Sequence, residues 1–385
     1  MLLLWLGGID MRITMLAVPP LVPLIHRELG LDEKQVAALV SLPVLLFAVA
    51  AVPGSLLIAK FGVRGALVAG LGVVALFGAM RGLGPSTPVL FGATSLMGIG
   101  IAVVQPAFPT LVRAWFPRRI ALATAVFSNG FLVGETIPSA LTTPVGVLQI
   151  AHGDWRWALA FWSVFVAVTA IAIALVAPAR GPRPDVPARW WPSWMEGPAV
   201  RIGVVMGMAS AVYFGTNAFI PDYLDQTHRH NLIPATLAVL NGSQLFTAPA
   251  VALWDRVLMG RAGFMGSAVL MVIAQVGIIF TPGAGVIAWA GVIGFSTALG
   301  FIVALAMPAK LAAEGDVHRM SAAIFTVQYT VGFVLPLIAG AMWDATGVAA
   351  LAFVPGLAGA AAMGFLAIGL SLHAAPVAPR PTGVP

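Results

Sequence analysis

The hexapeptide VGETIP at residues 133–138 has a counterpart, VGFVLP, at residues 331–336. The two stretches lie 198 positions apart in the chain. Nearly the same shift, 196 and 199 positions, relates two pairs of prolines, Pro53 with Pro249 and Pro109 with Pro308. A nearly constant shift is typical of an internal duplication. The repeat predicts a fold built of two related halves.

The composition places this duplicated chain in a membrane. Hydrophobic residues make up 60% of the 385 residues and charged residues only 9%. A soluble domain carries about 25% charged residues because its surface must face water. Lipid must therefore surround most of this chain. The absence of cysteine excludes disulfides and thiolate metal sites.

Breaking the chain at charges and at glycine and proline clusters gives twelve apolar segments. Each has about the 20 residues that a helix needs to cross a bilayer. The segments are 3–26, 36–59, 65–84, 88–112, 120–149, 156–177, 201–221, 232–254, 263–281, 285–308, 320–343 and 348–372. The segment 120–149 is too long for one straight crossing and must tilt, kink or leave the membrane.

These spans predict an all-α membrane protein with two six-helix bundles. The bundles occupy residues 1–177 and 201–385, the second with a short tail, and a proline- and arginine-rich linker at 178–200 joins them. If the N-terminus is cytoplasmic, 14 of the 20 lysines and arginines fall in cytoplasmic segments and one, Arg12, falls inside a span. The other five are assigned to outer loops: Arg27, Lys34, Arg81, Arg156 and Arg229. Because cytoplasmic loops keep the positive charge, we expect both termini in the cytoplasm and the protein in the cell (inner) membrane.

Six spans, a cytoplasmic linker and six more spans resemble the major facilitator superfamily. The loop GSLLIAKFGVRGAL (54–67) is similar to the basic loop motif of that superfamily. Lys60, Gly62 and Arg64 match its basic and glycine positions, whereas Ala59 stands at a usually acidic position. The resemblance implies transport by alternating access, with the first span lining a central cavity and this loop taking part in the conformational change.

The second half echoes the loop motif in WDRVLMGR (254–261), through Asp255 and Arg256. Three stretches resemble the cyanate permease and 2-nitroimidazole transporter branch of the superfamily. They are MRITMLAVPPLVPLI (11–25), LVSLPVLLFAVAAVPGSLL (39–57) and GIGIAVVQPAFPTLVRAWFPRR (98–119). That branch usually has Asn-Leu-Arg-Pro in its first span; here Arg12 matches the arginine, while Asp10 and Ile13 replace the other polar and proline positions.

Three ionisable residues, Asp10, Arg12 and Glu135, fall deep within predicted spans. A charge at mid-bilayer costs about 3 kcal/mol on insertion scales, so such residues are usually functional and paired. Asp10 and Arg12 are two positions apart and do not share a helix face. Arg12 either binds an anionic substrate or is held in a permanent salt bridge with Glu135 or Asp10. Glu135 is either a proton-coupling acid or the counter-charge of Arg12.

Uncharged polar side chains gather at similar depths in other spans and are candidates for a small polar pocket. They are Gln105, Asn129, Tyr213, Asn217, Asn241, Gln244, Gln328 and Tyr329. Each taken singly also fits a helix–helix hydrogen bond. Adding the repeat shift to Arg12 leads to Tyr213, so these two are expected to face each other.

The sequence thus predicts a secondary transporter and not an enzyme. We expect it to move a small organic or inorganic anion, or a small polar heteroaromatic, through a central site that contains Arg12. The alternative is an exporter of apolar drugs or metabolites in which Arg12 is structural. No phosphate-binding loop for nucleotide hydrolysis is present, and the scattered charges form no basic patch. We expect no cofactor, metal or nucleic-acid partner, a monomer in the lipid bilayer, and a proton as the possible coupling ion.

Overall fold

The computed structural model describes residues 1–84, 86–105, 111, 115–116, 119–142, 146–177, 197–258, 261–305 and 317–368. Within these ranges the chain forms helices and no strand. The α-helices are α1 (Leu2–Leu16), α2 (Val22–Leu29), α3 (Glu33–Met80), α4 (Thr87–Val104), α6 (Ile120–Leu141), α7 (Val147–Ile150), α8 (Trp155–Val176), α9 (Gly197–Gln226), α10 (Ile233–Gly242), α11 (Thr247–Leu253), α12 (Asp255–Leu258), α13 (Arg261–Phe280), α14 (Gly285–Leu305), α16 (Val317–Thr346) and α17 (Val354–Ile368). Four 3₁₀ turns connect some of them: η1 (Pro19–Leu21), η2 (His230–Leu232), η3 (Ser243–Phe246) and η4 (Ala349–Phe353).

Ten helical segments of the described chain are long and apolar enough to cross a membrane. Each of them coincides with a predicted span, so the prediction of an all-helical, multi-pass membrane protein is confirmed. The two other predicted spans, 36–59 and 120–149, fall on the first part of α3 and on α6 with α7. The total of twelve and the cytoplasmic location of the termini remain predictions.

Two backbone features break the long apolar runs. The first span divides at Pro19 and Pro20, since proline lacks the N–H that would continue the hydrogen bonds of α1. Gly62 in α3 has φ 73° and ψ 166°, a conformation that glycine adopts without steric cost. This break coincides with the glycine of the predicted loop motif and separates the two predicted spans, 36–59 and 65–84, that fall on α3.

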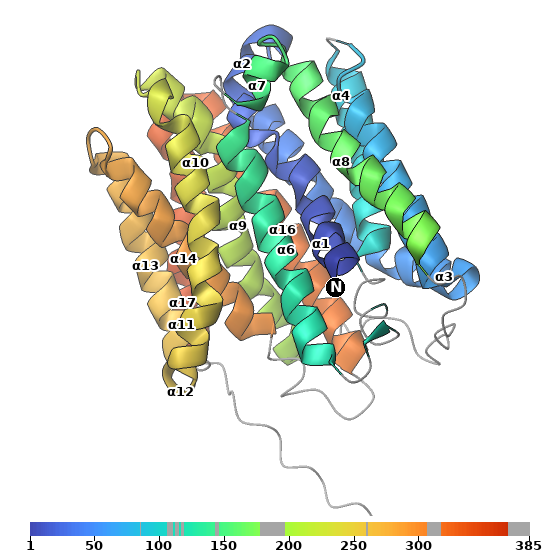
Figure 1. Cartoon of the computed structure of the whole chain (residues 1–385). Helices are drawn as coiled ribbons and strands as arrows, with labels where there is room; N and C mark the ends of the chain where they lie inside the picture. The colour runs from blue at the N-terminus through green and yellow to red at the C-terminus, as the bar shows by residue number, and fades with distance from the viewer. Residues whose placement is uncertain are drawn as a thin grey trace, which may run out of the picture.

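The helices form two groups in Figure 1, an N-terminal group (α1 to α8) and a C-terminal group (α9 to α17). In the first, α3 packs on α4 and α8, and α1 packs on α6. In the second, α9 packs on α16 and α17, and α13 packs on α14. The groups meet where α3 lies along α16 and where α6 lies along α10. We call the end of the molecule at which α2 ends and α3 begins, drawn at the top of Figure 1, the upper end.

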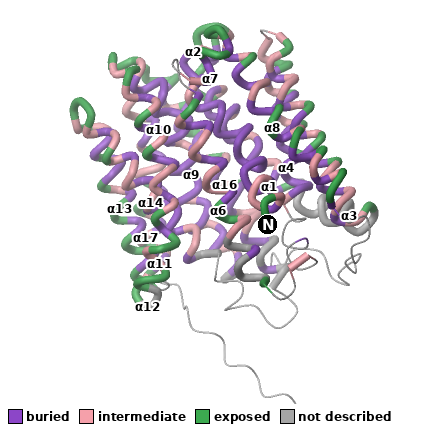
Figure 2. Tube along the Cα trace, viewed as in Figure 1, coloured by how far each residue is buried: buried purple, intermediate pink, exposed green. Residues whose placement is uncertain are grey.

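Burial distinguishes the central helices from those at the periphery. In the first span, 78% of the most apolar window is buried, against 39% in α8. Figure 2 shows the same contrast, with α1 mostly buried and exposed positions along α8. The exposed side chains of α8 include Val164, Val168, Ile171 and Leu175, spaced by three or four residues. An apolar stripe of this kind on the outside of a helix is suited to lipid.

Two predictions about the ends of spans need correction. Helix α9 begins at Gly197, inside the predicted linker 178–200, of which 178–196 lie outside the described residues. Arg81 was assigned to an outer loop, but its side chain is fully buried. It donates hydrogen bonds to the carbonyl oxygens of Thr14 at 3.0 Å and Gly78 at 3.2 Å. Thr14 lies in the last turn of α1, where carbonyls lack intrahelical donors, and this explains why the guanidinium points inward.

Candidate functional site

Glycine contacts between α1 and α6 set the position of the charged centre. A Cβ atom on Gly8 would lie 2.4 Å from the carbonyl oxygen of Phe127, and one on Gly134 would lie 2.4 Å from that of Ile9. Gly130, one turn before Gly134, meets the carbonyl oxygen of Trp5 in the same way, at 2.2 Å. Small residues four apart let membrane helices approach until their backbones touch. The close approach brings the side chains that follow on both helices together.

The side chains brought together are Arg12 of α1 and Glu135 of α6. Nε of Arg12 lies 3.2 Å from Oε1 of Glu135, and both residues are buried, at 6% and 3% exposed. Of the two acids that the sequence offered as partners, Glu135 is therefore the one that pairs with Arg12. Asp10 is not part of this ion pair and lies near Thr169 of α8. Asp10 is also buried, and its Oδ2 has no hydrogen-bond partner among the described residues.

The guanidinium of Arg12 is poorly satisfied by this ion pair. Although Nε is close to the carboxylate, its N–H is not aligned with it, and Nε counts as a buried donor without a hydrogen bond. Within the described part of the chain, the guanidinium donates one hydrogen bond, from Nη1 to Sδ of Met15 at 3.8 Å. A thioether sulfur is a weak acceptor. Arg12 is thus held near an acid while retaining donor capacity.

Aromatic rings surround the same guanidinium. Its Cζ lies 4.1 Å from the ring centroid of Phe131 and 5.6 Å from that of Phe47, within the range of a cation–π contact. Phe47 in turn meets the ring of Tyr329 edge-on at 5.4 Å. Tyr329 belongs to α16, in the other group of helices. The aromatic contacts therefore extend from Arg12 across the interface between the groups.

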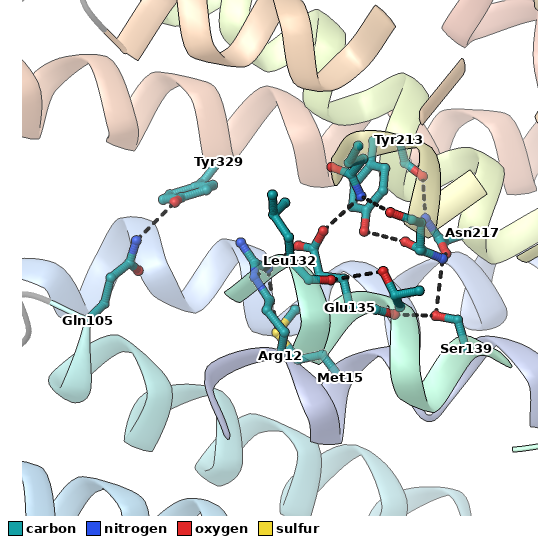
Figure 3. Close-up of polar contacts among 12 residues, drawn as sticks. Arg12, Met15, Gln105, Leu132, Glu135, Ser139, Tyr213, Asn217 and Tyr329 are labelled. Atoms are coloured by element: carbon teal, nitrogen blue, oxygen red, sulfur yellow. Dashed lines mark hydrogen bonds and ion pairs between the residues drawn. The ribbon is translucent and has the colours of Figure 1, made fainter. Parts of the chain in front are cut away.

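Glu135 connects the ion pair to the C-terminal group. Its Oε2 accepts a hydrogen bond from Nε2 of Gln244 at 2.8 Å. Figure 3 shows Glu135 between Arg12 on one side and a polar cluster around Tyr213 on the other. Tyr213 donates to Oδ1 of Asn241 at 2.6 Å, and Nδ2 of Asn241 donates to Oδ1 of Asn217 at 3.1 Å. All four polar side chains of the C-terminal group were expected from the sequence.

Ser139 completes this cluster and was missed from the sequence. Its hydroxyl accepts a hydrogen bond from Nδ2 of Asn241 at 3.1 Å and donates one to the carbonyl oxygen of Glu135 at 2.6 Å. Ser139 follows Glu135 by four residues and therefore lies on the same face of α6. This spacing of four residues is the sequence feature from which Ser139 could have been predicted to lie beside Glu135.

A second polar contact between the groups lies beyond Phe47. Nε2 of Gln105 donates to the hydroxyl of Tyr329 at 3.2 Å, so these two predicted residues meet. Gln328 turns the other way and donates to Ser210 at 2.9 Å, within the C-terminal group. Asn129 is exposed and accepts a hydrogen bond from the indole of Trp5 at 2.9 Å. The structure therefore brings neither Gln328 nor Asn129 into contact with the charged centre.

The predicted loop motif is described in part. Gly62 forms the break in α3, and Arg64 donates a hydrogen bond to the carbonyl oxygen of Ala174 in α8. Lys60, Asp255 and Arg256 lie outside the residues whose side chains the structure describes. Through Arg64, the part of α3 that follows Gly62 is therefore attached to α8.

Apolar helices enclosing a buried ion pair and polar side chains from two packed groups are the features of a multi-pass membrane transporter. The family profile described as the Major Facilitator Superfamily matches residues 4–336. The chain belongs to this superfamily, whose members are transporters and not enzymes.

Individual relatives agree with this assignment. The 2-nitroimidazole transporter of Escherichia coli (strain K12) is 27% identical over 287 residues, which cover 71% of this chain and 70% of that protein. The cyanate transport protein CynX of the same organism is 28% identical over 173 residues, 45% of this chain and only 44% of that protein. A crystal structure of a bacterial homolog of the human lysosomal transporter Spinster, inward-facing and occupied, has a TM-score of 0.74 at 16% identity and covers 98% of this chain and 97% of its own. At that identity the likeness establishes the fold alone.

Proposed function

We propose that this protein is a secondary transporter that carries a small anion, or a small polar heteroaromatic compound, past Arg12 by alternating access. The observation that carries the proposal is the state of the Arg12 guanidinium: it is buried, it lies beside Phe47, which contacts Tyr329 of the other half, and it donates one weak hydrogen bond among the described residues. A guanidinium presents five N–H donors in a plane and cannot lose its charge in a protein. An anion that accepts two parallel hydrogen bonds would fill donors that Glu135 and Met15 leave free.

The aromatic rings favour a small planar substrate. Phe131 and Phe47 lie beside the guanidinium, and Tyr329 reaches the same place from α16. Aromatic rings stack on planar ligands or meet them edge-on. Two relatives are a cyanate transport protein and a 2-nitroimidazole transporter, and cyanate is a small anion and 2-nitroimidazole a small polar heteroaromatic. Both kinds of cargo suit a positive charge bordered by aromatic faces.

Charge balance gives Glu135 a second role. Arg12 and Glu135 form a neutral pair, and an added anion would leave one uncompensated negative charge in a buried site, which is unfavourable. Uptake of a proton by Glu135 would cancel that charge. We therefore propose that Glu135 is both the resting counter-ion of Arg12 and the group that couples anion movement to a proton. Protonation of Glu135 would weaken the hydrogen bond that it accepts from Gln244 and would thereby change a contact with the C-terminal group.

The polar cluster supplies the rest of the proposed site. Tyr213, Asn217, Asn241 and Gln244 lie on the C-terminal side of Glu135, and Gln105 bridges to Tyr329. Because these side chains now bond one another, a substrate would exchange some of those bonds for its own. Asp10, which faces α8, stays outside this proposed substrate pocket.

The remaining predictions about organisation are retained as part of the proposal. The two halves would rock about the central site. The linker, which ends where α9 begins at Gly197, and both termini would lie in the cytoplasm, and the protein would be a monomer in the inner membrane. The basic loop positions Lys60, Gly62 and Arg64, with Asp255 and Arg256 in the second half, would control the conformational change. On this orientation the upper end faces out of the cell.

One observation favours a second candidate function. Arg12 and Glu135 both belong to the N-terminal group, so their salt bridge can hold α1 against α6 without any substrate. In that case the protein would export apolar drugs or metabolites, and Arg12 would be structural.

Two measurements on purified protein separate the candidates. A thermal-shift screen of cyanate, nitrate, small carboxylates and nitroimidazoles identifies a cargo, and uptake of that cargo is then measured in proteoliposomes. Arg12→Lys and Arg12→Ala should each lower uptake more than about thirtyfold, the equivalent of about 2 kcal/mol for a truncated charge pair. Arg81→Lys is the matched control, since Arg81 is a buried arginine of the same group whose hydrogen bonds in the described part of the chain go to carbonyl oxygens. Uptake that persists in both Arg12 variants, in folded protein, removes anion recognition and leaves apolar export.

A further inference from the structure

A second group of ionisable side chains joins the two halves at the upper end, far along α1 and α2 from Arg12. It consists of His26 of α2, Glu33 at the start of α3 and Asp222 of α9. Nδ1 of His26 lies 2.7 Å from Oδ2 of Asp222 and 3.9 Å from Oε1 of Glu33. One ligand atom from each of the three lies within 4.8 Å of the other two. The proposed transport cycle assigns these residues no role.

The acids in this cluster exceed what one imidazole can satisfy. Glu33 and Asp222 are each only 4% exposed, and Oε2 of Glu33 is buried without a hydrogen-bond partner. Asp344 of α16 brings a third carboxylate close, but it accepts from the backbone N–H groups of Glu33 and Lys34, at 2.8 and 3.0 Å. A buried carboxylate oxygen without a partner is costly. The cluster therefore has an unfilled acceptor beside an imidazole nitrogen and a second carboxylate.

We propose that His26, Glu33 and Asp222 bind a divalent transition-metal ion of the zinc type. One imidazole and two carboxylates are donors that zinc accepts, and three protein ligands leave a fourth position for water. Ligands of a tetrahedral zinc ion at about 2.0–2.2 Å stand roughly 3.3 Å apart, close to the separations found among these atoms. On binding, Nδ1 of His26 turns from its hydrogen bond with Asp222 to the metal, and Oε2 or Oε1 of Glu33 gains a partner.

Because of the position of this site, a bound metal ion would affect transport. His26 and Glu33 belong to the N-terminal group and Asp222 to the C-terminal group, so one ion would join the halves. The helices already touch beside the site, where a Cβ on Gly340 of α16 would lie 2.6 Å from the carbonyl oxygen of Glu33. If access alternates as proposed above, this end must open once in every cycle, and this consequence rests on that proposed function. A bound metal would hold the end closed and slow transport.

Metal binding is tested on the full-length protein in detergent, by calorimetric titration with ZnCl₂ and by the shift in unfolding temperature. The wild type should bind one Zn²⁺ saturably and unfold at a higher temperature. His26→Gln, Glu33→Gln and Asp222→Asn should each weaken binding by at least the roughly tenfold that loss of an outer-shell partner of a metal ligand costs. His152→Gln is the matched control, because His152 is an exposed histidine of the upper end outside the cluster. It should bind Zn²⁺ as the wild type does.

A wild type without saturable Zn²⁺ binding, or with binding unchanged in His26→Gln and Asp222→Asn, overturns the proposal and leaves a hydrogen-bonded contact between the halves. Uptake in proteoliposomes then tests the consequence: external Zn²⁺ should slow the wild type several-fold and chelator should reverse this, while Asp222→Asn should not respond. The two proposals fail separately. Zn²⁺ binding without Arg12-dependent uptake rejects only the proposed function, and Arg12-dependent uptake without Zn²⁺ binding rejects only the metal site.

Discussion

Two of the described arginines of the N-terminal group, Arg12 and Arg81, are buried, and their surroundings differ. Arg81 closes the end of α1: it donates to the carbonyl oxygen of Thr14, whose helix is about to break at Pro19. Arg12 lies against a carboxylate, a thioether and two aromatic rings. The backbone carbonyl oxygens that accept from Arg81 are fixed in place. In contrast, the carboxylate of Glu135 can be protonated, and the sulfur of Met15 is a weak acceptor that a substrate oxygen can replace. The comparison suggests that burial alone does not mark a functional charge; the replaceability of its partners does.

Removing the acid beside Arg12 should have the largest effect. Glu135→Gln leaves the guanidinium buried without a counter-charge, and breaking a buried pair in this way costs about 3–5 kcal/mol. We expect a large fall in unfolding temperature that a substrate anion reverses, because the anion replaces the lost charge. Since the glutamine resembles a protonated Glu135, uptake in this variant should also stop responding to a proton gradient.

The measurement is the unfolding temperature of Glu135→Gln with and without the anion found in the screen. Wild-type protein, which keeps its own counter-charge, serves as the control and should gain less from the same anion. If the variant is as stable as the wild type, or if the anion stabilises both equally, Arg12 is a structural arginine like Arg81.

The second test acts on the other arginine. Arg81→Met removes the donor to Thr14 and leaves that carbonyl oxygen buried and unpaired, at a cost of about 1–3 kcal/mol. The free energy of unfolding should fall, while the order in which the folded protein binds different anions should not change. Both are read from thermal shifts with a panel of anions. If the order of anion affinities changes, the end of α1 contributes to the binding site. Arg81 would then not be purely structural, and the proposed difference between the two arginines would be wrong.

A third test shifts the helix that carries Arg12. In Gly134→Ala the new methyl group meets the carbonyl oxygen of Ile9 at 2.4 Å, so α1 and α6 must move apart. Overpacking of this kind costs about 1–3 kcal/mol, and it should also weaken anion binding by moving Arg12 away from Glu135. Gly72→Ala in α3 is the control, because nothing lies within 4 Å of its added Cβ and alanine favours a helix. Equal stability of the two variants would mean that the glycine contact does not position the pair.

Composition was enough to predict the membrane class, because it averages over many residues. The superfamily was predicted from the resemblance of the 6+6 arrangement and of the loop 54–67 to that superfamily. The site was predictable only as a set of alternatives. Glu135 and Asp10 were both possible partners of Arg12, and the choice depended on how closely α1 packs against α6. That packing comes from glycines, whose effect appears only when two helices meet. Neighbouring residues such as Gln328 and Tyr329 differ by about 100° around a helix, so only one of them could face Arg12.

Charged residues near the ends of spans were the main source of error. Arg81 was predicted to face an outer loop because no partner for its charge stands nearby in the sequence. Its acceptor, the carbonyl oxygen of Thr14, lies 67 positions away in the chain. His26, Glu33 and Asp222 stand near the ends of predicted spans, and their contact depends on how the two halves meet. The order of residues along the chain does not show which residues from different halves meet in the folded protein. The cluster at the upper end was therefore not predicted.

The smallest expected effect concerns the edge of the proposed site. Tyr329→Phe keeps the ring that packs on Phe47 and loses only the hydrogen bond from Gln105. A single neutral hydrogen bond between membrane helices averages about 0.6 kcal/mol, so anion affinity should fall by no more than about threefold. Tyr223→Phe is the control, since its hydroxyl contacts carbonyl oxygens of α13 instead of the centre. A loss greater than about tenfold in Tyr329→Phe alone would mean that the hydroxyl touches the substrate directly, and the binding site would then extend from Arg12 onto α16.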